Sequence, residues 1–552
     1  MNFSLIKKLF ILGFLTLPLT LFLKISIDSN NRQKLQAYLQ TFLPEKTAAT
    51  PAKETEIKPT KPSPPPREDR NFDVVVYGDE LPGICAAIWA KKTLGNNAQV
   101  ALIRPNAADA QLGGLLTRGG LGYLDFDKTP GWYWQPHSQC FNEFLDKAQI
   151  VEACVEPENA HKALQQMLAE AGVILISEST LMPAVEEGKI EYVEVKNRNL
   201  RIKATAYIDA TQDAELARKA GLEYYLGYES QNPKLRNETL AVSIVPIVEG
   251  LSISDLRNVE ADILYDYQKM AEIEDSIRKN QPPDGARFWL NNFWQPLFQR
   301  YRDGFYQKSI AMGAAYHLEK NQPFKLEGFF FDKANICLKT TGKLSWNGFL
   351  FKYSVEEVRE LEENGFKPNQ EMIEEMAAVE EWLRKLSGKD VRIKLPPEVY
   401  VRHSLSIKDV VDPLTGQEIL RGGTMPANSM GTFSYEFDFR GGIKGIGIKM
   451  PPLPIYNFGI ESALAKNVEN LAIVGRSSGY AGIAVSVGRI LTVNIYQGQG
   501  VGVAAGLAVK SGRPLNGITS GEVRQTLDGL TGLTTYLQGE DTTWGVDYSE
   551  IK

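Results

Sequence analysis

The sequence predicts an α/β fold built on a parallel sheet, with a mixed α+β region inserted into it and a membrane-targeting segment ahead of it. Three apolar runs carry the prediction of the sheet: residues 73–77, 99–103 and 207–211. The first and the third lead directly into a short turn and then into a helical stretch. Apolar, β-branched runs that alternate with helices are typical of strands covered on both faces, as in a parallel sheet.

The turn after the first strand reads Gly-Asp-Glu-Leu-Pro-Gly, from Gly78 to Gly83, and a helical stretch follows over 84–92. This arrangement holds a dinucleotide pyrophosphate at a helix N-terminus. We expect Gly78 to allow the tight turn and Gly83 to let the helix pack closely on the sheet. Glu80 stands where a middle glycine is usual, and Arg104 where an acidic residue usually bonds a ribose hydroxyl. A strand–helix–strand unit without a ligand remains the alternative.

Composition sets the class of protein. The chain has 552 residues, of which 43% are hydrophobic, so it can bury a large core, and length alone predicts two to four units. The formal net charge is only −6, which argues against a nucleic-acid binder with a concentrated basic surface. The four cysteines and four histidines show no metal-ligand spacing, so no metal site is predicted.

The first 27 residues read as a targeting segment. Lys7 and Lys8 precede fifteen uncharged residues, 9–23, a run short of the ~20 residues of a spanning helix. No small-residue cleavage site follows, which favours an uncleaved anchor over a cleaved signal or a cytoplasmic membrane-associated end. The positive flank favours an extracytoplasmic body, in a periplasm or lumen. Residues 28–70, with six prolines from Pro51 to Pro66, read as an extended spacer.

A second glycine-rich turn lies at 112–122, where Gly113 and Gly114 open a run of five glycines. Glycines clustered in this way let a backbone approach a ligand, although a purely structural loop is the competing interpretation. Near the C-terminus, residues 490–509 carry no charge and place Gly498, Gly502 and Gly506 four residues apart. This pattern suits a buried helix packed on the sheet, with a membrane helix as the weaker alternative.

These segments together resemble the FAD-dependent oxidoreductases of the glutathione-reductase type. The strand end at 209–211 and Asp213 match the family pattern, although Gln212 replaces a glycine, and residues 470–512 match better. The resemblance implies FAD as the cofactor, with a helix N-terminus next to the flavin ring. It implies cofactor contacts at Gly78, Gly83, Arg104, Gly113, Gly114, Ala210, Thr211, Asp213, Gly475, Arg476, Arg489, Gly498 and Gln499.

The resemblance also implies a division of the chain. The FAD-binding part is expected from two segments, 71–230 and 441–515, with a substrate domain, 231–440, between them and an extension, 516–552, after them. Within the middle part, Ser354 and Glu357 form a capping box, and a helix is expected over 369–386. The predicted function is an enzyme that takes a hydride from a small-molecule substrate and passes electrons to an acceptor that the sequence does not identify.

Arg402 and His403 are the candidate catalytic residues, because they lie where the resembling family has an arginine-rich segment. A cation at this point would bind an anionic substrate, and a histidine would move a proton near neutral pH. A structural role for both residues is the competing interpretation. Glu80, Arg104 and Gln212 replace residues that normally support the cofactor, so a non-catalytic binding protein on a degenerate flavin fold is the alternative function.

Two further features leave alternatives open. The aromatic residues of 287–306 and 132–134 suit either an ordinary core or a platform for a sugar or planar ligand, and core is the expected outcome. The four cysteines contain no Cys-x-x-Cys redox pair, so a dithiol reductase is excluded. Cys140 and Cys154 are the one pair considered for a disulfide, and we expect that bond not to form.

Overall fold

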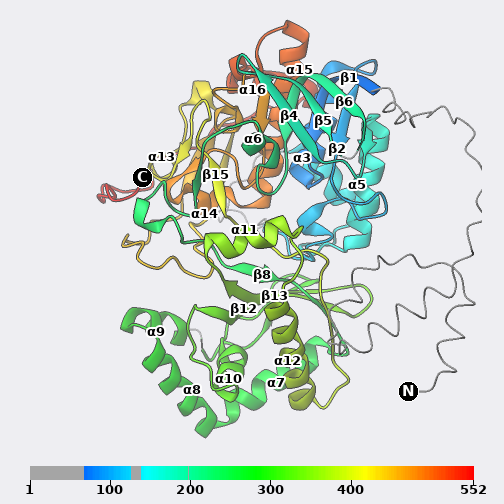
Figure 1. The fold of residues 1–552 in the computed structure, drawn as a ribbon. Helices are drawn as coiled ribbons and strands as arrows, with labels where there is room; N and C mark the ends of the chain where they lie inside the picture. The colour runs from blue at the N-terminus through cyan, green and yellow to red at the C-terminus, as the bar shows by residue number, and fades with distance from the viewer. Residues whose placement is uncertain (1–67, 126–137, 197, 292) are drawn as a thin grey trace, which may run out of the picture. The chain divides into compact units, whose positions relative to one another are not determined.

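The computed structural model describes residues 68–125, 138–196, 198–291 and 293–552 (Figure 1). The predicted anchor, nearly all of the predicted spacer and the aromatic residues 132–134 lie outside the described residues. Within the described part of the chain, no helix is both long enough and apolar enough to cross a membrane.

The first sheet contains the three strands that the apolar runs predict, but it is mixed and not wholly parallel, because β5 pairs antiparallel with both β4 and β6. Its strands lie in the order β3-β2-β1-β6-β5-β4. β19 pairs with the last residues of β6, whose first residues pair with β5. The pairings of β1 with β2 and β6, of β2 with β3 and of β6 with β19 are parallel. The bounds are β1 (Glu68–Tyr77), β2 (Val100–Ile103), β3 (Ile174–Ile176), β4 (Leu181–Glu186), β5 (Lys189–Val195), β6 (Leu200–Asp209) and β19 (Leu471–Ile473). Strands that lie almost 400 positions apart in the chain, β1 and β19, therefore belong to one sheet.

Two long helices pack tightly beside this sheet, α3 (Leu81–Leu94) and α15 (Leu491–Ser511). A side-chain carbon at Gly498 would lie 2.3 Å from the Pro82 carbonyl oxygen, and one at Gly502 would lie 2.2 Å from that of Ala86. The glycines spaced by four therefore form a packing face against α3. All but five residues of α15 are buried within the fold, which confirms the interpretation as a buried helix.

A second, largely antiparallel sheet lies in the middle of the chain, in the order β10-β11-β12-β13-β9-β14, with β8 also paired to β13. Its strands are β8 (Val242–Ile244), β9 (Ile247–Glu249), β10 (Phe298–Gln299), β11 (Gly304–Tyr306), β12 (Gly328–Leu338), β13 (Leu344–Lys352) and β14 (Arg392–Lys394). Helices α7 (Ile253–Tyr265), α8 (Tyr267–Asn280), α10 (Ala311–Glu319) and α12 (Gln370–Ser387) lie beside it (Figure 1). One hydrophobic cluster joins these helices to the sheet.

The remaining elements connect and cover these two sheets. They are α4 (Gln139–Lys147), α5 (Pro157–Ala171), α6 (Glu215–Lys219), β7 (Tyr224–Leu226), α9 (Pro283–Leu290), α11 (Val355–Glu363), β15 (Leu405–Ile407), β16 (Leu414–Thr415), α13 (Gly416–Leu420), β17 (Gly431–Ser434), β18 (Ile455–Phe458), β20 (Tyr480–Ala481), α14 (Val485–Gly488) and α16 (Ser520–Thr531). The capping box of Ser354 and Glu357 is present at the start of α11, and Asn369 caps α12. Both local predictions are confirmed.

The aromatic stretch 287–306 divides between core and surface. Trp289, Phe293 and Phe305 are buried, and all three pack in the second hydrophobic core with α8 and α10. Phe288 and Trp294 are about half exposed, at 53% and 52%. The expected core role is therefore confirmed for only part of the stretch.

Cys140 and Cys154 do not pair with each other, as expected, but the interpretation of them as the one pair to consider is wrong, because each pairs with another cysteine. Cys85 forms a disulfide with Cys140, and Cys154 forms one with Cys337, so all four cysteines of the chain are paired. The packing of α4 beside α5 and α15 brings Cys140 to a Cα distance of 5.9 Å from Cys85 in α3. Sequence spacing gave no sign of either pairing, because the partners are 55 and 183 residues apart.

Candidate functional site

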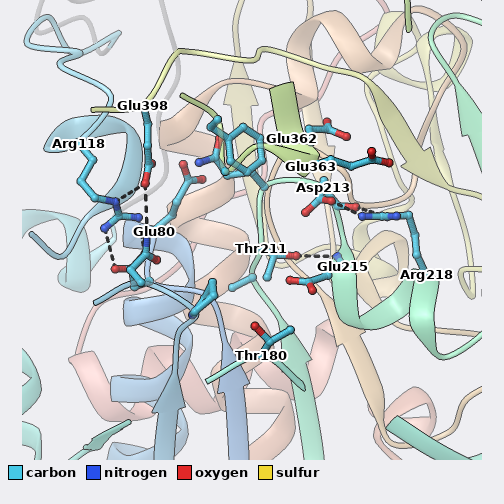
Figure 2. A pocket seen from close by; sticks show the side chains of 18 of the residues that line it. Glu80, Arg118, Thr180, Thr211, Asp213, Glu215, Arg218, Glu362, Glu363 and Glu398 are labelled. Atoms are coloured by element: carbon cyan, nitrogen blue, oxygen red, sulfur yellow. Dashed lines mark hydrogen bonds and ion pairs between the residues drawn. The ribbon is translucent and has the colours of Figure 1, made fainter. Parts of the chain in front are cut away.

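A cavity of about 360 Å³, called the main cavity below, opens at the carboxyl ends of β1 and β6 (Figure 2). Ligands of open α/β sheets bind at this edge, where the loops that follow neighbouring strands diverge. The walls come from the turn after β1, the segment after β6, helices α6 and α11, and the loop around Glu398. Of the predicted cofactor residues, Gly78, Ala210, Thr211 and Asp213 line this cavity.

The two glycines of the first turn have the roles that the sequence predicts. Gly78 has a φ of +115°, and a side-chain carbon there would lie 2.4 Å from the Ala210 carbonyl group. A side-chain carbon at Gly83 would lie 2.5 Å from that of Ala210. The first helix is thus held against the end of β6 at the distance that a dinucleotide-binding turn requires.

Glu80 occupies the N-terminus of α3. Its side chain is only 6% exposed, and Arg476 donates to both carboxylate oxygens, at 2.7 and 2.8 Å. The Leu115 amide adds a long hydrogen bond of 3.4 Å. A side-chain carbon at Gly114 would lie 2.5 Å from the Glu80 side chain, so this glycine makes room for Glu80. An internal carboxylate therefore lies at the helix end that in this motif faces a phosphate.

Arg104 is enclosed by the protein and does not line the cavity. It is 1% exposed, and Asp79 accepts from it at 3.0 Å. Its other donors reach the Ser177 hydroxyl and the carbonyl oxygens of residues 107, 108 and 110. All of its N–H groups are thus used within the protein. The expectation that Arg104 contacts the cofactor is not supported by this geometry.

A buried ion-pair network continues from Asp79. Arg118 donates to both oxygens of Asp79, at 2.8 and 2.9 Å, and to Glu398 at 2.5 Å. Burial alone would lower the pKa of Arg118, but the charges of Asp79 and Glu398 raise it above its usual value. Burial raises the pKa of Glu398, although Arg118 opposes that shift. Sequence reasoning missed Arg118 and Glu398, because they are 280 residues apart and belong to no motif.

The cavity lining carries more acid than base. Its carboxylates are Asp79, Glu80, Asp213, Glu215, Glu362, Glu363 and Glu398, and its cations are Arg118, Arg218, Lys219 and Arg359. Several of these groups are labelled in Figure 2, where Asp213 pairs with Arg218. Burial, followed by the charge of Asp213, raises the pKa of Glu362 to about 7. A carboxyl group whose pKa is raised in this way takes up a proton more readily, which reduces the excess negative charge of the cavity lining.

Asp209 closes the buried end of β6. It accepts hydrogen bonds from the amide and hydroxyl of Thr211, at 3.0 and 2.7 Å, and from the amide of Ala217 at 2.8 Å. Burial raises the pKa of Asp209 to about 7, despite these hydrogen bonds. This carboxyl group fixes the turn that presents Thr211 to the cavity.

The other predicted cofactor residues lie outside the main cavity. Gly113 has a left-handed backbone and lies against Leu164, whereas no atom lies within 4 Å of the side-chain position at Gly475. Gly498 packs on α3, as described above. Gln499 accepts from the Ser138 hydroxyl at 2.8 Å and the Cys140 amide at 3.1 Å, which ties α15 to the start of α4.

Arg402 and Arg489 line a second, small cavity of about 30 Å³. Arg489 pairs with Asp438 and donates to the Tyr400 hydroxyl at 3.1 Å. Arg402 is 3% exposed, and its guanidinium group lies over the Tyr400 ring. The structure thus brings Arg402, predicted to be catalytic, together with Arg489, predicted to bind the cofactor.

His403 does not share this cavity. It is 1% exposed, and its Nε2 lies 3.1 Å from the Gly227 carbonyl oxygen. Burial lowers the pKa of His403 to about 4, so the ring is neutral at pH 7. The expectation that His403 titrates near neutral pH is therefore wrong, because the sequence does not show how deeply the ring is buried.

The FAD that the resemblance implies can be tested against this geometry. The strand–turn–helix unit, the close glycines, the edge cavity and the open space at Gly475 all fit a dinucleotide. Glu80 is the departure, because a phosphate and its carboxylate cannot both occupy the N-terminus of α3. The residues therefore fit FAD except at Glu80, whose carboxylate is paired with Arg476.

Comparison with known proteins agrees with this reading of the fold. A family model described as FAD dependent oxidoreductase matches residues 73–527. No curated protein sequence matches the chain. The chain is similar to the solved structure of the myxobacterial chondrochloren halogenase CndH, at 10% identity over 83% of this chain and 78% of that one, with a TM-score of 0.36. It is also similar to L-proline dehydrogenase from P. horikoshii, at 10% identity over 84% of this chain and 99% of that one, with a TM-score of 0.35.

A third similar structure is p-nitrophenol 4-monooxygenase PnpA from Pseudomonas putida DLL-E4, at 10% identity over 84% of this chain and 90% of that one, with a TM-score of 0.35. These structural likenesses are weak, so the assignment rests on the family model, which spans most of the chain. The chain belongs to the family of FAD-dependent oxidoreductases, enzymes whose cofactor is FAD.

Proposed function

We propose that this enzyme takes a hydride from a small-molecule substrate onto FAD and passes the two electrons on to a separate acceptor. The observation that carries the proposal is the strand–turn–helix unit of β1 and α3 beside a cavity at the end of β6, within the span of the family match. When bound, FAD supplies a site that takes up two electrons as a hydride. The substrate correspondingly loses a hydride and a proton.

The residues proposed to hold the cofactor surround the main cavity. The close turn at Gly78 and Gly83 and the N-terminus of α3 bring backbone amides to the diphosphate. Thr211 presents its hydroxyl at the end of β6, and Arg476 supplies a cation once it is free of Glu80. The open space at Gly475 leaves room for the cofactor next to that arginine.

We further propose the two-segment, glutathione-reductase-type division of the chain. The pairing of β19 with β6 supports a cofactor domain drawn from 71–230 and 441–515. The separate sheet of β8–β14 and its own hydrophobic cluster support a substrate domain over 231–440. Arg402, in the last quarter of that segment, is proposed to contact the substrate.

An extracytoplasmic body tethered by the N-terminus is part of the same proposal. The uncharged run 9–23 behind two lysines supports the tether, and the two disulfides support an oxidising compartment. A membrane quinone or a lipid-soluble substrate would suit that position. Protease protection on intact membranes tests the orientation, since cleavage from the cytoplasmic side alone would contradict it.

The redox proposal is tested by anaerobic mixing of the FAD-loaded chain with panels of alcohols, amines and carboxylic acids. A substrate is expected to bleach the flavin band near ~450 nm, and an added quinone is expected to restore it. A flavin that binds but is bleached by none of these classes, while dithionite does reduce it, would contradict hydride transfer from such substrates.

One observation favours the alternative of a non-catalytic binding protein. The Glu80–Arg476 pair fills the phosphate position, and the cavity beside it is lined with more carboxylates than cations. A chain that takes up no FAD, even after Glu80 is replaced by alanine, would favour this alternative. Exposed Phe288 and Trp294 offer a sugar platform, which soluble-glycan binding would test.

A further inference from the structure

The second cavity contains an arginine with no opposite charge bound to it. The Arg402 side chain is only 3% exposed. No carboxylate of the described residues lies within 4 Å of its guanidinium nitrogens. One Nη donates to the Ala241 carbonyl oxygen at 2.6 Å, and the group stacks on Tyr400 at 4.5 Å from the ring centre. Its Nε is buried and has no hydrogen-bond partner. A buried cation left in this way is costly unless an anion completes it.

The neighbouring arginines do have partners. Arg489 pairs with Asp438, and Arg440 pairs with Asp332 at 2.7 Å and with Asp438 at 3.6 Å. Two carboxylates therefore serve these two arginines, and neither is bonded to Arg402. The cavity lining as a whole has four cations, Lys333 and the three arginines, against two carboxylates, Asp125 and Asp438. The lining is short of negative charge beside Arg402.

Other polar atoms around the same cavity also lack partners. The Nε of Arg489 and the Oδ1 of Asn347 are buried without a hydrogen bond, and both residues line the cavity with Arg402. Asn347 lies in β13, opposite Asn335 of β12, which also lines it. Two arginines that line this cavity thus each have a buried Nε without a hydrogen-bond partner.

Size and shape limit what fits. The volume of about 30 Å³ suits one planar, carboxylate-sized group or about two waters. A guanidinium group binds a carboxylate through two parallel hydrogen bonds, and a neutral group of the same shape gains no such charge-assisted bonds. Burial also lowers the pKa of Arg402 to about 10, which leaves it charged at pH 7.

We propose that this cavity is a binding site for a carboxylate group and that Arg402 is its principal ligand. Carboxylate binding stands on the cavity alone. The further step, that this carboxylate belongs to the substrate, rests on the oxidoreductase function proposed above and makes the substrate class an organic acid. The Nε and a free Nη of Arg402 hold the two oxygens, and Arg489 adds a donor from the C-terminal segment.

Acetate and acetamide are the probes, because they share a shape and differ in charge. Thermal unfolding of the full chain in detergent is followed with each probe at constant ionic strength. Acetate is expected to raise the midpoint by about 2 °C, and acetamide is expected to leave it unchanged. Equal responses to the two probes would overturn the proposal.

Variants assign the response to the cavity. Arg402→Gln is expected to abolish the acetate shift. The matched control is Arg201→Gln, because Arg201 also stacks on a tyrosine, at 4.2 Å from the Tyr192 ring, but lies outside the cavity. The control variant is expected to keep the full shift. An acetate shift that survives Arg402→Gln unchanged would overturn the proposal.

A second variant covers the case in which Arg402→Gln does not fold. Asn347→Asp places a carboxylate on the cavity wall, where it can serve as an internal counter-charge. The midpoint without acetate is expected to rise, and the acetate response is expected to vanish. A full acetate response in Asn347→Asp would by itself contradict the proposed site.

The same samples separate this proposal from the redox function. Their visible spectra report bound flavin independently of the acetate response. An acetate response in a chain that binds no FAD would leave the carboxylate site standing and remove the substrate assignment. A flavin-loaded chain without an acetate response would overturn the site and leave the redox function untouched.

Discussion

At the scale of single residues, the proposed binding of FAD depends on the ion pair between Glu80 and Arg476. Their side chains are 6% and 4% exposed, and removing one partner leaves the other charge buried alone. Glu80→Ala is therefore expected to lower the free energy of unfolding of the FAD-free chain by about 3 kcal/mol. The same change frees Arg476 and the N-terminus of α3, so the affinity for FAD is expected to rise about tenfold or more.

Fluorescence titration with FAD and urea unfolding measure these two effects. Glu260→Ala is the matched control, because Glu260 is also a fully buried glutamate, held by the Leu297 amide, but lies outside the cavity. It is expected to lower stability without changing FAD affinity. An unchanged FAD affinity in Glu80→Ala would show that the carboxylate does not compete with the cofactor.

His403 predicts a pH effect with a definite sign. Its folded pKa is lowered from 6.5 to about 4, so the unfolded chain binds the proton more readily. The stability that the neutral ring contributes is complete above pH 6.5 and is lost as the pH falls toward 4, by about 3 kcal/mol in all. Urea unfolding of wild type and His403→Gln between pH 7.5 and 4.5 is expected to show a smaller loss in the variant. Identical slopes would contradict the burial of the neutral ring.

Residues of the site differed in how far the sequence could predict them. Gly78 and Gly83 were predictable because their roles follow from the local backbone of one turn. The pairing of Glu80 with Arg476 was not, because the two residues are 396 positions apart. Glu80 and Arg104 were recognised as departures from the motif, but only the fold shows that buried partners satisfy both of them.

At the scale of elements, the close approach of α15 to α3 depends on glycine. A methyl group at Gly502 would lie 2.2 Å from the Ala86 carbonyl oxygen, and backbone cannot yield as a flexible side chain does. Gly502→Ala is expected to lower the free energy of unfolding by about 3 kcal/mol. Thermal or urea unfolding measures the change.

The control for this prediction is a helical glycine without neighbours. Gly529 lies in α16, and nothing lies within 4 Å of its side-chain position. Gly529→Ala is expected to stabilise the chain by about 0.5 kcal/mol, because alanine favours helix. Equal effects of the two substitutions would contradict tight packing between α3 and α15.

Strands and helices were predictable where a pattern is local. The apolar runs predicted β1 and β2, and the capping box and Asn369 predicted the starts of α11 and α12. The hairpin of β12 and β13 was not predicted. Its aromatic residues follow no clear period, so their pattern does not distinguish a strand from a buried helix. The order of the strands in either sheet was not predictable, because it depends on pairing between residues far apart in the chain, which a single sequence does not reveal.

At the scale of the whole molecule, two disulfides join distant parts of the chain. Cys154–Cys337 links the first cofactor segment to β12, and Cys85–Cys140 links α3 to α4. Each bond is expected to contribute about 2–5 kcal/mol to stability. A reductant is therefore expected to lower the unfolding midpoint, and less so in a Cys154→Ser, Cys337→Ser double variant, which has one bond left to lose.

Thiol labelling of the chain from its native membranes tests the proposed compartment. With both bonds formed, an alkylating mass tag is expected to add nothing under denaturing conditions until a reductant is present. Labelling of all four cysteines without a reductant would contradict an oxidising location. This result would bear on the proposed compartment alone, and not on the binding of FAD.

The central claim is that this chain binds FAD at the β1–α3 turn and can release Glu80 to do so. The visible absorption spectrum of the purified full chain, before and after addition of FAD and removal of the excess, tests it most directly. The account predicts bands near ~375 and ~450 nm that stay with the protein, stronger in Glu80→Ala than in the wild type. A colourless wild type and a colourless Glu80→Ala after FAD addition would contradict it.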